Sequence, residues 1–361
     1  MRIRGMGIAI AAFALTGTMF HAGCSTTSKT TPTRTKTPTV FSGPTSTATD
    51  SPTNTATNTP IATATPVLAP QVWTGNSGGN NTTVYNAATF TLISNYTTGA
   101  FSRGVGLHPN GLYAYVVNDS GGTVNVLNTS SGAILATVTL GTAPMWVAVA
   151  PNGSRGYFTN RTSGSVSVMD LTNNTLVATV AGLSNCRGIC VSSNNSYVYV
   201  ANDTAGYGVS VINAATNTIS GTVPGVQARG ISITPNGSYL YIAGGSATSN
   251  AYVASTSSLT VIATITVGAS PYMSAVAPNG LRAYVSNFTP GSVSVIDTSS
   301  NAVIATITVG ASPIGVTIHP NGTYGYTSNF GAGTSTVFDT ASNTVLATVT
   351  TGAGPQGIAA Q

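Results

Sequence analysis

Three arginines and two aspartates recur at matching positions in the sequence. Arg103 lies 16 residues before Asp119, and Arg187 lies 16 residues before Asp203, so each pair is expected to form an ion pair. Arg229 has a glycine at the same offset and therefore no carboxylate partner. An unpaired guanidinium can make a bidentate, charge-assisted contact. Arg229 is therefore the best candidate for holding an anion or a sugar.

These residues belong to a repeat that is marked by a recurring Pro-Asn-Gly turn. Its last residue falls at 42- or 43-residue intervals, at Gly111, Gly153, Asn195, Gly237, Gly280 and Gly322. A constant period in this range indicates a repeat architecture. Each copy reads as four short strands, illustrated by residues 315–320, 324–329, 335–340 and 344–350. Four antiparallel strands in 42 residues predict a propeller blade.

One aromatic residue per copy gives the number of blades. The column contains Trp73, Tyr115, Tyr157, Tyr199, Tyr241, Tyr284 and Tyr326. The first copy begins near Gln71 without an inner strand, whereas residues 355–361 match an inner strand and nothing else. The expected fold is therefore all-β, a seven-bladed β-propeller over residues 71–361 that the C-terminal strand closes by joining the first blade.

A ligand site should lie where the repeat is broken, and one column breaks it. The residue that enters each inner strand is Arg103, Met145, Arg187, Arg229, Tyr272, Ile314 or Gln356. In the next column Trp146 and Met273 replace glycine. This column should ring the mouth of the central channel, with Trp146 and Tyr272 assisting Arg229. The alternative is that the column only packs the rim and that exposed ion pairs there contribute little.

Several segments resemble the YVTN-type β-propeller repeat of archaeal surface-layer proteins and bacterial periplasmic propellers. YVSN at 284–287, YFTN at 157–160 and YVAN at 199–202 stand where that family has its YVTN motif. The resemblance covers residues 71–361. It implies a propeller of a group with structural, binding and uncharacterised members, so a fold-level analogy defines no activity.

Other repeated polar residues are expected to be structural. They include an asparagine column at the end of the second strand, and Asp170, Asp297 and Asp339, which read as turn caps. Cys186 and Cys190 lie four residues apart on one expected strand, about 13 Å. That separation is too large for a disulfide, so both should be buried free thiols.

The small number of carboxylate side chains gives little support to an enzymatic function. The chain contains no glutamate, and residues 71–361 contain five aspartates, whereas glycosidases use paired carboxylates. His108 and His319 begin turns and have no carboxylate to complete a metal site. No cofactor or metal is expected, and a lyase or lactonase type of propeller enzyme remains the alternative to a binding protein.

The N-terminus is typical of an exported lipoprotein. Residues 1–23 have a basic start, an apolar run of about 16 residues and small residues before Cys24, the expected site of lipidation. Residues 24–70 form a Thr/Ser/Pro-rich segment with too few apolar side chains to fold, which is typical of a tether.

These features together predict a non-catalytic binding or cell-surface scaffold module. We expect an envelope location, on the outer membrane or cell surface, with the lipid anchor in the membrane. The partner would be an envelope glycan, a small anion or a protein. Six arginines against five aspartates in residues 71–361 exclude the basic surface of a nucleic-acid-binding protein.

Overall fold

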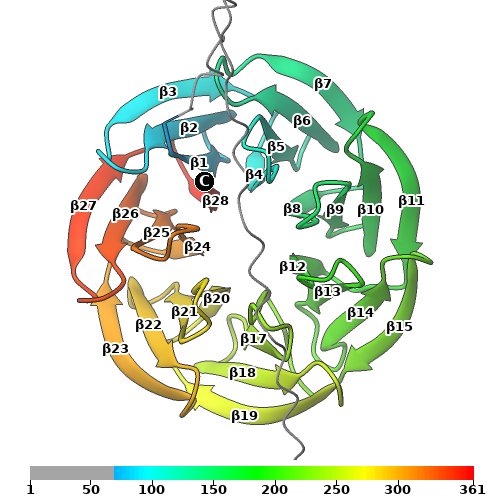
Figure 1. Cartoon of the computed structure of the whole chain (residues 1–361), viewed down its shortest axis with the longest axis vertical. Helices are drawn as coiled ribbons and strands as arrows, with labels where there is room; N and C mark the ends of the chain where they lie inside the picture. The colour runs from blue at the N-terminus through cyan, green and yellow to red at the C-terminus, as the bar shows by residue number, and fades with distance from the viewer. Residues whose placement is uncertain (1–68) are drawn as a thin grey trace, which may run out of the picture. The chain divides into compact units, whose positions relative to one another are not determined.

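The computed structural model describes residues 69–361, which form seven four-stranded antiparallel sheets arranged in a ring (Figure 1). The predicted all-β, seven-bladed propeller is therefore confirmed. The expected signal segment 1–23, the lipidation site Cys24 and all but two residues of the tether 24–70 lie outside the described residues.

The blades are numbered here from 1 to 7 in chain order, and the strands of each are given from the channel outward. Blade 1 contains β28 (Pro355–Ala360), β1 (Gln71–Asn76), β2 (Asn81–Asn86) and β3 (Leu92–Thr97). Blade 2 contains β4 (Ser102–Leu107), β5 (Tyr113–Asn118), β6 (Thr123–Asn128) and β7 (Ile134–Thr139). Blade 3 contains β8 (Pro144–Val149), β9 (Arg155–Asn160), β10 (Ser165–Asp170) and β11 (Thr175–Ala181). Blade 4 contains β12 (Cys186–Val191), β13 (Tyr197–Asn202), β14 (Val209–Asn213) and β15 (Thr218–Val223).

The remaining three blades follow the same order. Blade 5 contains β16 (Gly230–Ile233), β17 (Tyr239–Ala243), β18 (Asn250–Ser255) and β19 (Thr260–Thr266). Blade 6 contains β20 (Pro271–Val276), β21 (Arg282–Asn287), β22 (Ser292–Asp297) and β23 (Ala302–Thr308). Blade 7 contains β24 (Pro313–Ile318), β25 (Tyr324–Asn329), β26 (Thr334–Asp339) and β27 (Val345–Thr350).

The C-terminal strand completes the ring by supplying the inner strand of blade 1. β28 pairs antiparallel with β1, with Trp73 opposite Ala359 and Val72 opposite Ala360. The backbone N–H of Gln361 then donates to the carbonyl of Gln71 at 3.0 Å. Closure leaves no blade without its inner strand.

The blades pack face to face through the second and third strands, whose residues are almost all buried. The aromatic column lies at these contacts, and each of its members is at most 3% exposed. Tyr115 of blade 2, for example, shares an apolar cluster with Phe158 and Met169 of blade 3. The outermost strands, such as β7, alternate between exposed and half-buried residues. The column is therefore structural, as its periodicity predicts.

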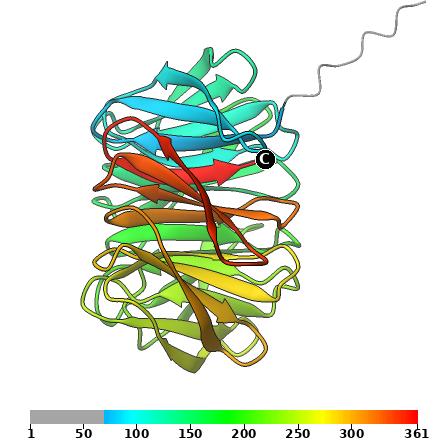
Figure 2. The same cartoon turned by 90° about the vertical axis from the view of Figure 1, so that its left-hand side faces the viewer.

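The strands run between two faces of the ring (Figure 2). We call the face where the inner strands begin and the second strands end the upper face. The lower face carries the Pro-Asn-Gly turns after the inner strands, and it is turned toward the viewer in Figure 1. Both Gln71, where β1 begins, and Gln361 lie on the lower face.

The asparagine column is structural, as expected, and its side chains form buried ladders of hydrogen bonds. All six members are 0% exposed: Asn76, Asn118, Asn160, Asn202, Asn287 and Asn329. In five of them the Nδ2 group bonds side-chain oxygens five and seven residues later, as in Asn287 to Ser292 and Ser294 at 3.1 and 3.0 Å. Asn202 reaches Ser210 and backbone carbonyls instead. These bonds tie the second strand of a blade to its third.

The predicted aspartate caps are confirmed on the lower face. Asp170, Asp297 and Asp339 each accept hydrogen bonds from the backbone and hydroxyl groups of the turn that follows. In blades 1 and 2 Asn86 and Asn128 cap the same turn. A carboxylate is therefore not required at this position.

Candidate functional site at the upper channel mouth

In most blades the residue of the broken column sits on a β-bulge; in blade 5 Arg229 directly precedes β16, whose pairing is regular. The pairing of the inner strand shifts register between Ser102 and Val105 in blade 2, and equivalent shifts occur in blades 3, 4, 6 and 7. A bulge frees residues from the strand ladder and redirects their side chains. The inner strands thus present this column at the upper mouth of the channel.

Neighbouring inner strands approach closely at the position after the bulge residue. A Cβ at Gly104 would lie 2.6 Å from the carbonyl oxygen of Met145, and one at Gly230 would lie 2.4 Å from that of Tyr272. Glycine is therefore required at most positions of this second column. Trp146 and Met273 are the two exceptions, and both place a large side chain at the mouth.

Apolar members of the column fill the mouth. Met145, Trp146, Tyr272 and Ile314 are 0%, 6%, 8% and 4% exposed and belong to one contiguous buried cluster contributed by blades 3, 4, 6 and 7. For Met145 and Ile314 the interpretation of rim packing is therefore correct. The indole Nε1 of Trp146 is buried and has no hydrogen-bonding protein partner.

The prediction that Arg229 lacks a carboxylate is wrong. Its Nε and Nη2 atoms lie 2.9 and 2.8 Å from Oδ2 of Asp203, which belongs to the preceding blade. A fixed offset within one blade does not reveal this partner, because the inner strands bring blades 4 and 5 side by side. Oδ1 of the same carboxylate accepts from Nε2 of Gln227 at 2.8 Å.

Arg187 shares this carboxylate, as the within-blade offset predicts. Its Nε lies 2.8 Å from Oδ2 of Asp203, but the N–H is not directed at that oxygen, so the contact is an ion pair without a hydrogen bond. Its Nη1 donates to the hydroxyl of Tyr272 at 3.1 Å. The guanidinium of Arg229 lies over the Tyr272 ring, 4.7 Å from its centroid, in a cation–π contact.

Arg103 occupies a separate, balanced cluster. It pairs with Asp119 as expected, and its Nη1 donates to Oε1 of Gln356 at 2.7 Å. Arg187, Arg229 and Tyr272 are therefore in direct contact with one another. Arg103 is not part of this group, because its partners belong to blades 1 and 2.

The ionised groups give the upper mouth an excess of positive charge. Four arginines lie on the upper face with two aspartates: Arg103, Arg161, Arg187, Arg229, Asp119 and Asp203. The difference is two positive charges, and both belong to blades 3 to 5. Burial lowers the pKa of Arg187, but a guanidinium stays protonated at any physiological pH.

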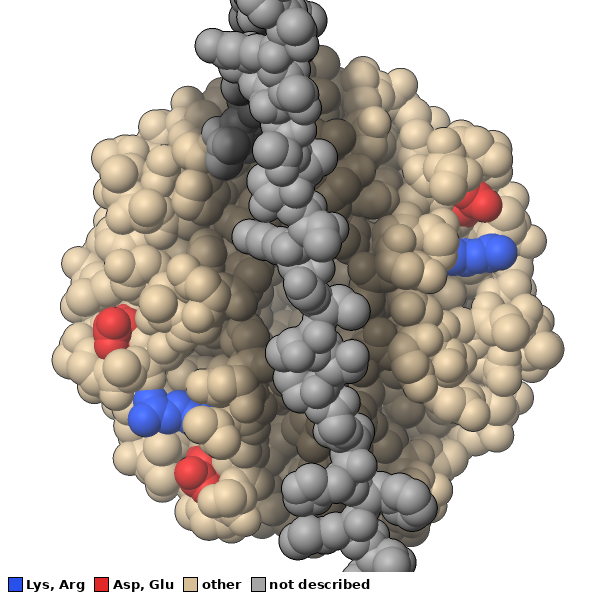
Figure 3. Space-filling model, viewed as in Figure 1, with Lys and Arg blue, Asp and Glu red and all other residues tan. Residues whose placement is uncertain are grey.

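The lower face has the opposite balance. It carries Arg155 and Arg282 with the three turn-capping aspartates. On the part of this face visible in Figure 3, charged side chains are few and lie toward the edges of the ring. The upper mouth is thus the cationic region of the described propeller.

The remaining reactive side chains have structural surroundings. Cys186 and Cys190 are free thiols, as predicted; Cys186 is fully buried and Cys190 is half-buried. Burial raises the pKa of Cys186 to about 11. His108 and His319 each accept a backbone N–H of their own turn through Nδ1. Within residues 69–361 no group of three His, Cys, Asp or Glu side chains could hold a metal ion.

Comparison with known proteins identifies the fold and no more. No family model matches the sequence, and no curated protein matches it. Hydrazine synthase of Kuenenia stuttgartiensis superposes with a TM-score of 0.65 at 20% identity, covering 76% of this chain and 92% of that chain. A protein of unknown function from Desulfotomaculum acetoxidans superposes with a TM-score of 0.70 at 15% identity, covering 81% and 99%.

A third similar structure is a dihydro-haem d1 dehydrogenase, with a TM-score of 0.59 at 14% identity, covering 80% of this chain and 74% of that chain. These identities are too low to carry an activity from one protein to another, because one fold hosts many functions. Within the described residues, no helix is long and apolar enough to span a membrane.

Proposed function

We propose that this chain is an exported, lipid-anchored propeller of the YVTN type that binds a small anionic group at its upper mouth without catalysing a reaction. The observation that carries the proposal is that Arg187 and Arg229 share the single carboxylate of Asp203. Two guanidiniums over one carboxylate retain a net positive charge beside an aromatic ring, which suits a small anion or an acidic envelope sugar.

The saturation of Asp203 argues against the enzyme alternative. Its two oxygens already accept from Gln227 and Arg229, and its side chain is 2% exposed. A lyase or lactonase acting here would need a free base or a metal-binding carboxylate at the mouth. The arginines retain N–H groups that no protein acceptor uses, so binding is the chemistry that the site supports best.

The first strand of the propeller begins away from the proposed anion site. β1 begins on the lower face, opposite the cationic mouth. The resemblance to the YVTN repeat and the Cys24 signal both favour a cell-envelope location, on the outer membrane or cell surface.

The binding proposal is tested with the full-length protein in detergent. The probe is methyl α-D-galacturonide, and the neutral methyl α-D-galactopyranoside is its uncharged counterpart. We expect only the anion to bind, and Arg229→Ala and Arg187→Ala to weaken it by about 1.5–3 kcal/mol, as for a hydrogen bond to a charged group. Arg155→Ala, on the lower face, is the matched control and should leave the affinity unchanged. Equal losses for all three variants would contradict a site at the upper mouth.

The anchor is tested separately by Cys24→Ser. We expect this variant to lose fatty-acid labelling and to leave the membrane fraction, because the cysteine is the proposed site of lipidation. Labelling that persists in the variant would rule out Cys24 as the anchor and would not affect the binding proposal.

A further inference from the structure

Tyrosines of the aromatic column close two of the blade junctions on the lower face. At the junction of blades 5 and 6, the hydroxyl of Tyr241 donates to Oδ1 of Asn301 at 2.9 Å. At the junction of blades 7 and 1, the hydroxyl of Tyr326 donates to the carbonyl of Ala87 at 3.1 Å. In both cases the second strand of one blade bonds directly to the turn between the third and fourth strands of the next.

The junction of blades 2 and 3 has the same two side chains but lacks this bond. Tyr115 stands at the position of Tyr241, and Asn174 stands at that of Asn301. The Oη of Tyr115 and the Oδ1 of Asn174 are both buried, and neither has a hydrogen-bonding protein partner. Both residues line one cleft of about 350 Å³ on the lower face. A buried polar atom left unpaired costs free energy, so a group that bridges the two atoms is favoured.

Two other polar groups that line this cleft, the His108 ring and Oδ1 of Asn110, already have partners. His108 contacts the carbonyl of Gly153 through Nε2 at 3.0 Å, and Oδ1 of Asn110 accepts from the backbone N–H of Leu112 at 2.9 Å. Among the residues that line this cleft, the buried side-chain atoms without a protein partner are therefore the Tyr115 hydroxyl and Oδ1 of Asn174.

The chemistry of these two atoms selects the ligand. An amide oxygen only accepts, and a phenol both donates and accepts. Burial raises the pKa of Tyr115, so its hydroxyl stays protonated and can donate. A bridging group that pairs the phenol proton as well as the amide oxygen must accept from the phenol and donate to the amide. A hydroxyl does both, whereas a carboxylate cannot donate and an ammonium cannot accept.

The cleft walls are amphipathic, like the faces of a sugar ring. Leu135, which is 54% exposed, and the buried Leu171 supply apolar surface. Tyr113 adds an aromatic ring that packs edge-on against His108. The cleft volume lies near the lower end of small-molecule sites, about 300–1,000 Å³.

We propose that the lower-face cleft between blades 2 and 3 binds a neutral sugar, one hydroxyl of which bridges Tyr115 Oη and Asn174 Oδ1. This site is independent of the proposed anion site. It lies on the opposite face of the ring and selects a different ligand chemistry.

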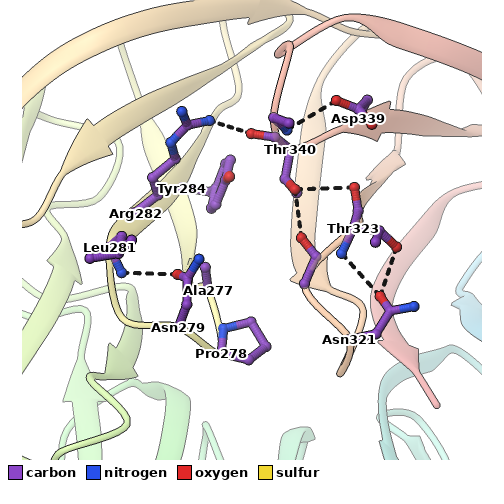
Figure 4. Close-up of a pocket in the computed structure, with 12 residues that line it drawn as sticks. Ala277, Pro278, Asn279, Leu281, Arg282, Tyr284, Asn321, Thr323, Asp339 and Thr340 are labelled. Atoms are coloured by element: carbon purple, nitrogen blue, oxygen red, sulfur yellow. Dashed lines mark hydrogen bonds between the residues drawn. The ribbon is translucent and has the colours of Figure 1, made fainter.

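The related cleft between blades 6 and 7 shows how the protein can occupy the same acceptor itself (Figure 4). Arg282 reaches across the junction, where its Nη1 bonds the carbonyl of Thr340 and lies 3.4 Å from Oδ1 of Asn343. Blade 2 has Tyr113 in place of Arg282. The cleft of blades 6 and 7 should therefore bind the sugar more weakly.

The test uses the full-length protein and ligand-observed NMR titration with the methyl glycosides of glucose, galactose and mannose. We expect at least one to bind with a millimolar dissociation constant. Tyr115→Phe should weaken it about tenfold, or about 1.4 kcal/mol, by removing one hydrogen bond. Asn174→Gly should do the same while keeping the turn, because Asn174 has φ +57° and blade 2 has Gly132 there with φ +69°.

Two control variants show whether the sugar binds at this cleft rather than elsewhere on the propeller. Tyr241→Phe makes the same change at the closed junction and should leave sugar binding unchanged. Arg229→Ala should also leave it unchanged, so that failure of the anion site and failure of this one are distinguishable. The proposal is overturned if no glycoside binds the parent protein, if both cleft variants bind like the parent, or if only one of them loses affinity.

Discussion

The two faces of the ring are built from the same repeat but depart from it to different degrees. On the upper face the bulge residue changes from blade to blade, so that arginine, methionine, tyrosine, isoleucine and glutamine occupy equivalent places. On the lower face the Pro-Asn-Gly turn after the inner strand recurs with little change, as does the Asp or Asn that caps the turn after the third strand. Positions that every blade needs for packing or for its turns keep the same type of residue. Side chains that differ in chemistry from blade to blade are found at the other positions.

The difference extends to how the charges are held. Asp203 is nearly buried and surrounded by donors from two blades, whereas Asp297 caps an exposed turn with donors from its own hairpin. The carboxylate of Asp203 therefore links two blades, whereas that of Asp297 completes a local turn. The following changes should separate these two roles.

The largest effect is expected from removing residues 355–361, which link both faces through β28. Blade 1 would lose its inner strand and the buried side chain of Ile358. A loss of about 5 kcal/mol is reasonable for exposing a strand edge and creating a cavity, which corresponds to roughly 10 °C or more in melting temperature. Circular dichroism melting of the full chain and the truncated chain measures it. A shift of one or two degrees would show that β28 does not close the ring.

The second change compares the two kinds of carboxylate. Asp203→Ala should destabilise the propeller by about 3 kcal/mol, because it leaves Arg187 and Arg229 mostly buried without a counter-charge. Residual access of water to both guanidiniums keeps this below the full cost of a buried charge. Asp297→Ala, at an exposed turn, should have a clearly smaller effect. Denaturant unfolding of both variants provides the comparison, and equal losses would remove the distinction between the faces.

Most of the fold could be predicted from the sequence because its determinants are local and repeated. The aromatic column fixes the number of blades, and the unmatched strands at 71 and 355–361 fix the closure. The ion pairs of Arg103 and Arg187 could be predicted because they lie within one blade at a constant offset.

The site could be predicted only in part, because its decisive contacts cross between blades. Arg229 bonds an aspartate 26 residues earlier, and Arg187 bonds a tyrosine 85 residues later. No constant offset in the sequence reveals these contacts. They form between blades, where the closely packed inner strands leave room for some side chains and not for others. The unpaired Tyr115 and Asn174 were hidden for a similar reason: their sequence positions match those of Tyr241 and Asn301, and only the packing separates a closed junction from an open one.

The smallest expected effect is the contribution of the lower-face carboxylates to the pH dependence of stability. Hydrogen bonds from Ser299 and Ser300 lower the pKa of Asp297 to about 2, and turn hydrogen bonds also lower the pKa of Asp170 and Asp339. A carboxyl whose pKa is depressed in the folded state stabilises the folded protein fully above its ordinary pKa of about 4. This stabilisation is lost as the pH falls toward 2.

Asparagine already caps the same turn in blades 1 and 2. A triple variant with Asp170→Asn, Asp297→Asn and Asp339→Asn should therefore preserve the turns while removing the titrating groups. The melting temperature of the parent should therefore fall more than that of the triple variant between pH 4 and 2. From pH 5 to 8 the two curves of melting temperature against pH should be parallel. Parallel curves over the whole range would show that the lower-face carboxylates act only as hydrogen-bond acceptors, so that their charge contributes nothing to the contrast between the faces.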